Sequence, residues 1–150
     1  GTLSVLGLEA CRTMSLLDVY APAVQQVLLQ VNHRLMPICY VNGCILGECA
    51  HASLALMRYL SVSGLGSAQE RLEEHLVKIH LRRDGKGGWT GFPYYYTLLV
   101  LSEMPGVLAV NERAYTAARC EKLLRRKAQP GAISERRVQL LQRVLAEAHP

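Results

Sequence analysis

The sequence predicts an all-α protein built as an array of αα-hairpin repeats, with about seven helices. Apolar residues recur at helical spacing along most of the chain, and no stretch alternates in the manner of a half-buried strand. The apolar half of the composition is aliphatic, with one Phe and one Trp, which is typical of helices that pack through Leu, Val and Ala. In addition, the helical segments align with one another at an offset of about 44 residues.

The first predicted helix, residues 3–17, has no partner helix of its own. Its apolar residues keep helical spacing, and residues 14–16 align with residues 58–60 at the repeat offset. It would therefore be the second half of an incomplete hairpin. The rest of the chain gives three helical hairpins, with the boundaries 18–62, 67–106 and 108–149.

Each hairpin is expected to pair an amphipathic helix with a second helix that faces inward. In the first hairpin a helix begins near Pro22 and ends before Pro37, and after a connector the segment 44–60 is apolar nearly all round. Ser67 and Glu70 form a capping box that starts the second hairpin. The helices of the third hairpin are expected over 110–127 and from Ser134 onward. Two layers follow, with the second helices as the inner wall.

The bend of the second hairpin, residues 82–93, is rich in glycine and leads into an apolar helix expected over 97–104. Its glycines permit backbone angles that are closed to other residues, and Pro93 fits a first helical turn. Three glycines fall in register at the repeat offset, namely Gly43, Gly87 and Gly131. We therefore expect one helical-repeat domain over 1–150, either a partial αα-barrel or a solenoid.

The segment from Asp84 to Pro93, followed by Tyr95, Tyr96 and Thr97, resembles the repeat of prenyltransferases and squalene or hopene cyclases. Proteins of that family carry an Asp-Gly-Gly-Phe/Trp-Gly turn between paired helices. The resemblance implies an αα-barrel whose inner helices line an apolar cavity for an isoprenoid. The chain lacks the Asp-x-Asp-Asp motif of the cyclases and the matched Asp, Cys and His zinc set of the transferases. HEAT-like solenoids have comparable repeat lengths and are the alternative.

Cys39, Cys44, Cys49 and His51 carry the side chains that zinc and copper prefer. On a helix that begins at residue 44, Cys44 and Cys49 point about 140° apart, and Cys49 and His51 about 200° apart. They cannot share an ion in that arrangement without help from the connector. The prediction is therefore that no metal is bound and that these cysteines are structural. The odd total of five cysteines also argues against a disulfide framework.

Residues around the glycine-rich bend are the predicted ligand contacts, namely Arg82, Arg83, Lys86, Trp89, Tyr94 and Tyr95. The aromatic residues have no counterparts in the other repeats. Basic residues near the ends of the first helices would align along one rim that could hold a phosphate or another acidic group. The alternative is that these cations only complement helix dipoles and that Trp89 packs the hairpin ends. No local nucleophile and base are associated, so no catalytic residue and no cofactor are predicted.

Lys and Arg outnumber Asp and Glu by 17 to 12, which gives a net charge of +5 and suits an anionic partner. Nucleic acid is not expected, because a recognised fold and paired stacking aromatics are missing. The longest charge-free run, residues 87–102, is broken by glycines and a proline, so no membrane span is expected. The cysteine usage favours a reducing cytoplasm, and the start at Gly1 leaves room for residues upstream.

These observations predict a non-catalytic helical-repeat module that binds a protein partner or associates with itself. The reason is that the apolar inner layer of so short an array needs covering. The alternative is binding, with or without turnover, of an isoprenoid-like or other apolar ligand in the inner-helix groove, with a phosphate held on the basic rim.

Overall fold

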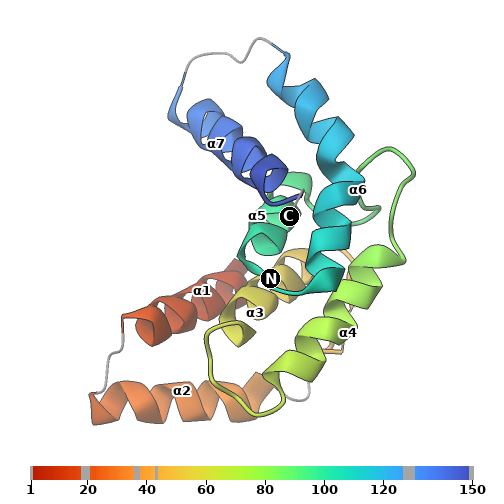
Figure 1. Ribbon diagram of the computed structural model, residues 1–150. Coiled ribbons are helices and arrows are strands. Elements are labelled where there is room, and N and C mark those ends of the chain that lie inside the picture. Colours follow the sequence, from red (N-terminus) through yellow and green to blue (C-terminus); the bar gives the residue numbers. More distant parts are fainter. Residues whose placement is uncertain (1, 18–20, 36–37, 43, 127–130, 149–150) are drawn as a thin grey trace. The chain divides into compact units, whose positions relative to one another are not determined.

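The structure, a computed structural model, describes residues 2–17, 21–35, 38–42, 44–126 and 131–148 (Figure 1). Within these ranges it contains seven helices and no strand, apart from an isolated antiparallel bridge between Arg83 and Trp89. The helices are α1 (Thr2–Leu16), α2 (Pro22–Leu35), α3 (Cys49–Leu60), α4 (Ala68–His80), α5 (Tyr94–Glu103), α6 (Val107–Leu124) and α7 (Ala132–Ala146). The predicted all-α fold class is confirmed. None of these helices is both long enough and apolar enough to cross a membrane.

The ends of the helices recur at close to the predicted period. The first helices of the hairpins, α2, α4 and α6, end at Leu35, His80 and Leu124, so their ends lie 45 and 44 residues apart. The lone helix and the second helices, α1, α3, α5 and α7, end at residues 16, 60, 103 and 146, with spacings of 44, 43 and 43 residues. The helix boundaries therefore agree with a hairpin repeat.

Helix α3 begins at Cys49, so the expected start at residue 44 is wrong. The backbone N–H of Cys44 donates to the carbonyl of Cys39 at 3.1 Å, which turns the chain back on itself. Gly47 then adopts a positive φ of 53°, a conformation that interrupts a right-handed helix. These turns hold residues 44–48 outside the helix even though their composition is apolar.

Smaller corrections concern α5, α6 and α7. Helix α6 begins at Val107 and ends at Leu124, each three residues before the bounds of the expected 110–127. Helix α5 begins at Tyr94 instead of residue 97, and Pro93 precedes it with an extended ψ of 113° instead of lying in the first turn. Helix α7 begins two residues before the expected Ser134, directly after Gly131. Of the three glycines placed in register, Gly87 and Gly131 both have positive φ, while Gly43 lies outside the described residues.

The chain divides into two compact units, residues 1–75 and 76–150, with the boundary inside α4. The expectation of one domain over 1–150, and of a barrel or solenoid, stays a prediction. In the first unit α1 packs against α3, as expected for second helices of successive repeats. Buried residues of these two helices include Leu8 of α1 and Leu54 and Leu56 of α3, each at most 2% exposed. Tyr59 of α3 donates to the Asn32 side chain of α2 at 2.7 Å.

In the second unit α5, α6 and α7 pack against one another (Figure 1). Arg113 of α6 is buried, and its guanidinium donates to the carbonyl oxygens of Leu101 and Met104 at the end of α5. It also donates to the carbonyl of Glu147 at the end of α7, at 3.3 Å. One cation therefore satisfies carbonyl groups at the ends of two helices, which orients α5 and α7 on α6.

Candidate anion-binding groove

The glycine-rich bend between α4 and α5 is organised by the carboxylate of Asp84. Its Oδ1 accepts hydrogen bonds from the backbone N–H of Lys86 at 2.7 Å, the backbone N–H of Gly88 at 2.8 Å and the hydroxyl of Tyr115 at 3.1 Å. These donors, with Gly88 foremost, hold the pKa of Asp84 below its usual value. Residues 84–88, called the turn below, are thereby closed around an ionised carboxylate.

At Gly87 the backbone of the turn directly contacts helix α6. It has a φ of +79°, and a Cβ added there would lie 2.8 Å from the Cβ of Arg119. The backbone of Gly87 also donates to the hydroxyl of Tyr115 at 3.2 Å and accepts from the hydroxyl of Thr116 at 2.6 Å. Because the backbone itself contacts the helix, only glycine fits this position without displacement.

A groove with a cavity volume of about 670 Å³ lies between the turn and α6. It is lined by one carboxylate, that of Asp84, and by four cationic side chains: Lys86 from the turn, Arg119 and Lys122 from α6, and Arg126 just beyond its end. On α6 these cations are spaced three and four residues apart, so they share one face of the helix. Positive charge from two separate elements therefore converges on the groove.

Arg119 is fixed in place, while the other three cations point to solvent. The Nη1 of Arg119 lies 3.3 Å from Oδ2 of Asp84, and its guanidinium stacks 4.3 Å from the ring centre of Tyr94. Lys86, Lys122 and Arg126 are exposed, and within the described part of the chain no hydrogen bond or ion pair engages their side chains. The groove thus combines one anchored cation with three that are available to a ligand.

Three of the predicted ligand residues, buried Trp89 and half-buried Tyr94 and Arg83, are engaged in contacts within the protein beside the turn. Trp89 is 5% exposed, donates from Nε1 to Glu112 Oε2 at 2.8 Å and stacks on Tyr94 with ring centres 6.1 Å apart. Arg83 donates to the same Glu112 carboxylate at 2.9 to 3.1 Å. The structure therefore uses Trp89, Tyr94 and Arg83 to build the bend, and their contact with a ligand stays a prediction.

The other three predicted residues have different surroundings. Tyr95 is half-buried under the guanidinium of Arg137, which lies 4.5 Å from its ring centre. Arg82 is exposed and does not line the groove. Lys86 is the one predicted contact that does line it.

Sequence reasoning missed Arg119 and Lys122. The signal was present, because basic residues at 119, 122 and 126 follow the spacing of one helical face. Neighbouring Arg125 pairs with Glu121 at 3.2 Å, and Lys127 lies outside the described residues.

Comparisons with protein-family models, with curated proteins and with solved structures find no match to this chain.

Proposed function

We propose that the chain is a non-catalytic helical-repeat module that binds an anionic ligand in the groove between the turn and α6. The observation that carries the proposal is the convergence of Lys86, Arg119, Lys122 and Arg126 on one groove, in which Asp84 is the only carboxylate among the described lining residues. Like charges gathered at close range repel one another, so such a cluster lowers stability unless an anion compensates it. A cluster kept at that cost is typical of a binding surface.

The complementing of helix dipoles explains only part of this arrangement. Lys122 lies in the last turn of α6 and Arg126 follows its end, where cations stabilise a helix by about 0.3–1 kcal/mol each. Lys86 belongs to the turn and Arg119 lies further inside α6, so the dipole of α6 does not account for their presence. Their convergence with the other two cations favours a ligand.

A phosphate-bearing small molecule suits the groove best. Arg presents a planar fork of N–H donors to phosphate oxygens, and Lys adds a mobile point charge, so the two together recognise phosphate. The cavity volume of about 670 Å³ lies within the range usual for small-molecule sites. An isoprenoid-like tail would need apolar surface, and Trp89 and Tyr94 are occupied by packing. The predicted protein partner or self-association remains a separate expectation.

Isothermal titration calorimetry with inorganic pyrophosphate tests the proposal. We expect saturable binding that weakens as salt is added, because surface charges are screened. Lys122→Gln and Arg126→Gln should each weaken binding at least about tenfold, since a charge-assisted hydrogen bond contributes about 1.5–3 kcal/mol. The matched control is Arg136→Gln, which removes one exposed positive charge from α7 outside the groove and should change the affinity less than about twofold. An equal loss of affinity in all three variants would show that binding depends only on net charge, and would contradict a specific site in the groove.

A further inference from the structure

The connector between α2 and α3 folds into tight turns that bring two cysteines together. The carbonyl of Cys39 accepts hydrogen bonds from the backbone N–H groups of both Asn42 and Cys44, each at 3.1 Å. The first of these closes a short turn, and the second returns the chain to its starting point. Backbone hydrogen bonds therefore hold Cys44 beside Cys39.

A second turn brings Cys49 to the other two cysteines. Gly47 adopts a positive φ of 53°, and the backbone N–H of Cys49 donates to the carbonyl of Leu46 at 3.1 Å. Cys49 then becomes the first residue of α3. The helix fixes its side chain on the same side as the other two cysteines.

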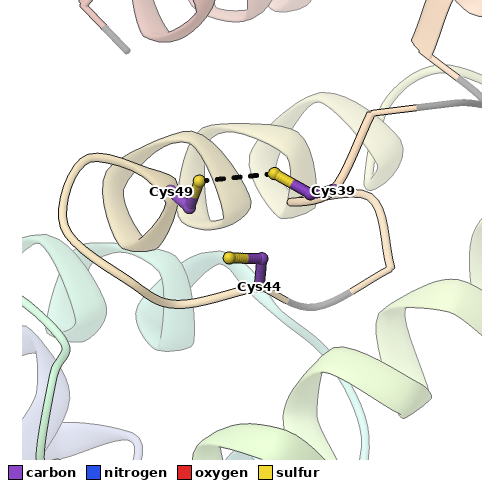
Figure 2. Close-up of side chains that lie close together, drawn as sticks. All are labelled: Cys39, Cys44 and Cys49. Atoms are coloured by element: carbon purple, nitrogen blue, oxygen red, sulfur yellow. Dashed lines mark hydrogen bonds between the residues drawn. The ribbon is translucent and has the colours of Figure 1, made fainter.

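Figure 2 shows the three thiols gathered at the start of α3, with the sulfur of Cys44 beside the Cys39–Cys49 pair. The sulfurs of Cys39 and Cys49 are 3.5 Å apart, and all three sulfurs lie within 4.8 Å of one another. Three thiolates bound to one zinc ion at about 2.3 Å would lie about 3.8 Å apart, which is within this range. Within the described ranges this is the one group of three or more Cys, His, Asp or Glu ligand atoms so close together.

The expected divergence of the cysteine side chains is therefore wrong. It required a helix that begins at residue 44, whereas Cys44 lies in the connector and Cys49 starts the helix. His51, the fourth residue suspected from the sequence, does not belong to the group and is exposed on α3.

The connector is anchored to the core of the first unit. Tyr40 and Val41, which follow Cys39, are 5% and 4% exposed. The Nε2 of His75 lies 3.3 Å from the carbonyl oxygen of Tyr40. His75 is itself only 2% exposed, although it lies on an amphipathic helix. With its neighbours buried, Cys39 is held near the other two sulfurs and loses little freedom when an ion binds.

We infer that Cys39, Cys44 and Cys49 form a binding site for one thiophilic metal ion of the zinc or copper(I) type. Thiolates select these soft ions over magnesium or calcium. Three protein ligands leave one position of a tetrahedral zinc open. A cavity of about 290 Å³, lined in part by Tyr40, Glu48 and Cys49, lies beside the cluster and has room for water or another exogenous ligand there.

The inference concerns the first unit and does not rest on the groove in the second. When the ion binds, each thiol gives its proton to solvent or buffer and its sulfur lone pair to the metal, without oxidation or reduction. The bound ion would tie the connector to the start of α3.

A titration of the reduced 150-residue chain with Cd²⁺ and Zn²⁺ under anaerobic conditions tests the site. We expect one equivalent of Cd²⁺ to produce thiolate-to-metal charge-transfer absorption, and Zn²⁺ to compete for the same site. Cys44→Ser and Cys49→Ser should each weaken binding more than tenfold. The matched control is the double variant Cys11→Ala/Cys120→Ala, which removes both buried cysteines outside the cluster and should bind like the wild type.

A second readout does not depend on how the variants fold. In the unmodified chain, Zn²⁺ should protect Cys39, Cys44 and Cys49 from alkylation, as counted by mass spectrometry of peptides. Unchanged affinity in the cluster variants, or no protection of these three residues, would overturn the inference. A reduced chain that binds no ion but forms a Cys39–Cys49 disulfide in air would also overturn it, and would assign the cluster to thiol oxidation.

Discussion

The close approach of the turn to α6 predicts that two neighbouring glycines differ in their tolerance of alanine. Gly85 and Gly87 have nearly the same backbone conformation, with φ of +73° and +79°. A Cβ at Gly85 meets nothing within 4 Å, whereas a Cβ at Gly87 would lie 2.8 Å from the Cβ of Arg119. The pair therefore separates the cost of the left-handed conformation from the cost of the contact.

The expected magnitudes follow from these contacts. Gly85→Ala should cost about 1–2 kcal/mol of unfolding free energy, which is the penalty for a side chain in the left-handed region. Gly87→Ala carries the same penalty and adds overpacking of about 1–3 kcal/mol, because two carbon atoms prefer to be about 3.5–4.0 Å apart. The turn would have to move away from α6 and lengthen the hydrogen bond that Thr116 donates to Gly87.

The fluorescence of Trp89 provides the assay for both variants. It is the only tryptophan in the chain and is buried beside the turn, so its fluorescence reports the unfolding of the second unit. Urea titrations of the wild type and both variants give the free energies. If Gly85→Ala and Gly87→Ala differ by less than about 0.5 kcal/mol, the seating of the turn on α6 is refuted.

Three further predictions concern charged groups and thiols. Glu112→Gln should lower the free energy of unfolding by about 3 kcal/mol in the same fluorescence assay, because the buried carboxylate accepts hydrogen bonds from Trp89 and Arg83. A decrease of less than about 1 kcal/mol would contradict this role of Glu112. The folded pKa of Asp84 is lowered, so its contribution to stability is present above about pH 4–5 and is lost as the pH falls towards that pKa. Asp84→Asn should therefore flatten the acid limb of a stability–pH curve, and an unchanged limb would count against the role of Asp84. Hydrogen bonds to Cys39 and Cys44 raise the pKa of Cys49 to about 11, so Cd²⁺ must displace the thiol proton when it binds. The affinity for Cd²⁺ should therefore rise with pH between about 6 and 8, and an affinity independent of pH in this range would argue against thiolate ligation.

Periodicity was sufficient to predict the fold class and the ends of most helices, although α6 ends at Leu124 instead of residue 127. Aliphatic residues at helical spacing define each helix, and the repeat offset predicts where successive helices stop, as the ends at Leu60 and Glu103 illustrate. The start of α3 could not be predicted in this way, because the turn at Gly47 interrupts a run whose composition alone favours a helix.

The burial of single polar residues was also beyond the sequence pattern. Glu112 and His75 lie on amphipathic helices, where a charged or polar side chain ordinarily faces solvent. Glu112 is nearly completely buried beside Arg83 and Trp89, and buried His75 contacts the carbonyl of Tyr40 in addition to that of Arg71, four residues before it. Partners 23 to 35 residues away leave no local signal.

The two candidate sites differ in how much of each could be predicted from the sequence. The basic face of α6 follows from the positions of Arg119, Lys122 and Arg126, and only the approach of Lys86 requires the fold. The convergence of the cysteines depends on turns in the connector, so spacing alone suggested the opposite result.

Chemical-shift mapping by NMR with inorganic pyrophosphate tests the central claim, that cations from the turn and from α6 form one anion site. The account predicts that perturbed backbone amides concentrate in residues 84–88 and 115–126, and that they saturate together with one affinity. Perturbations spread over basic residues outside the groove, such as Arg34 and Arg136, without saturation at 84–88, would contradict it.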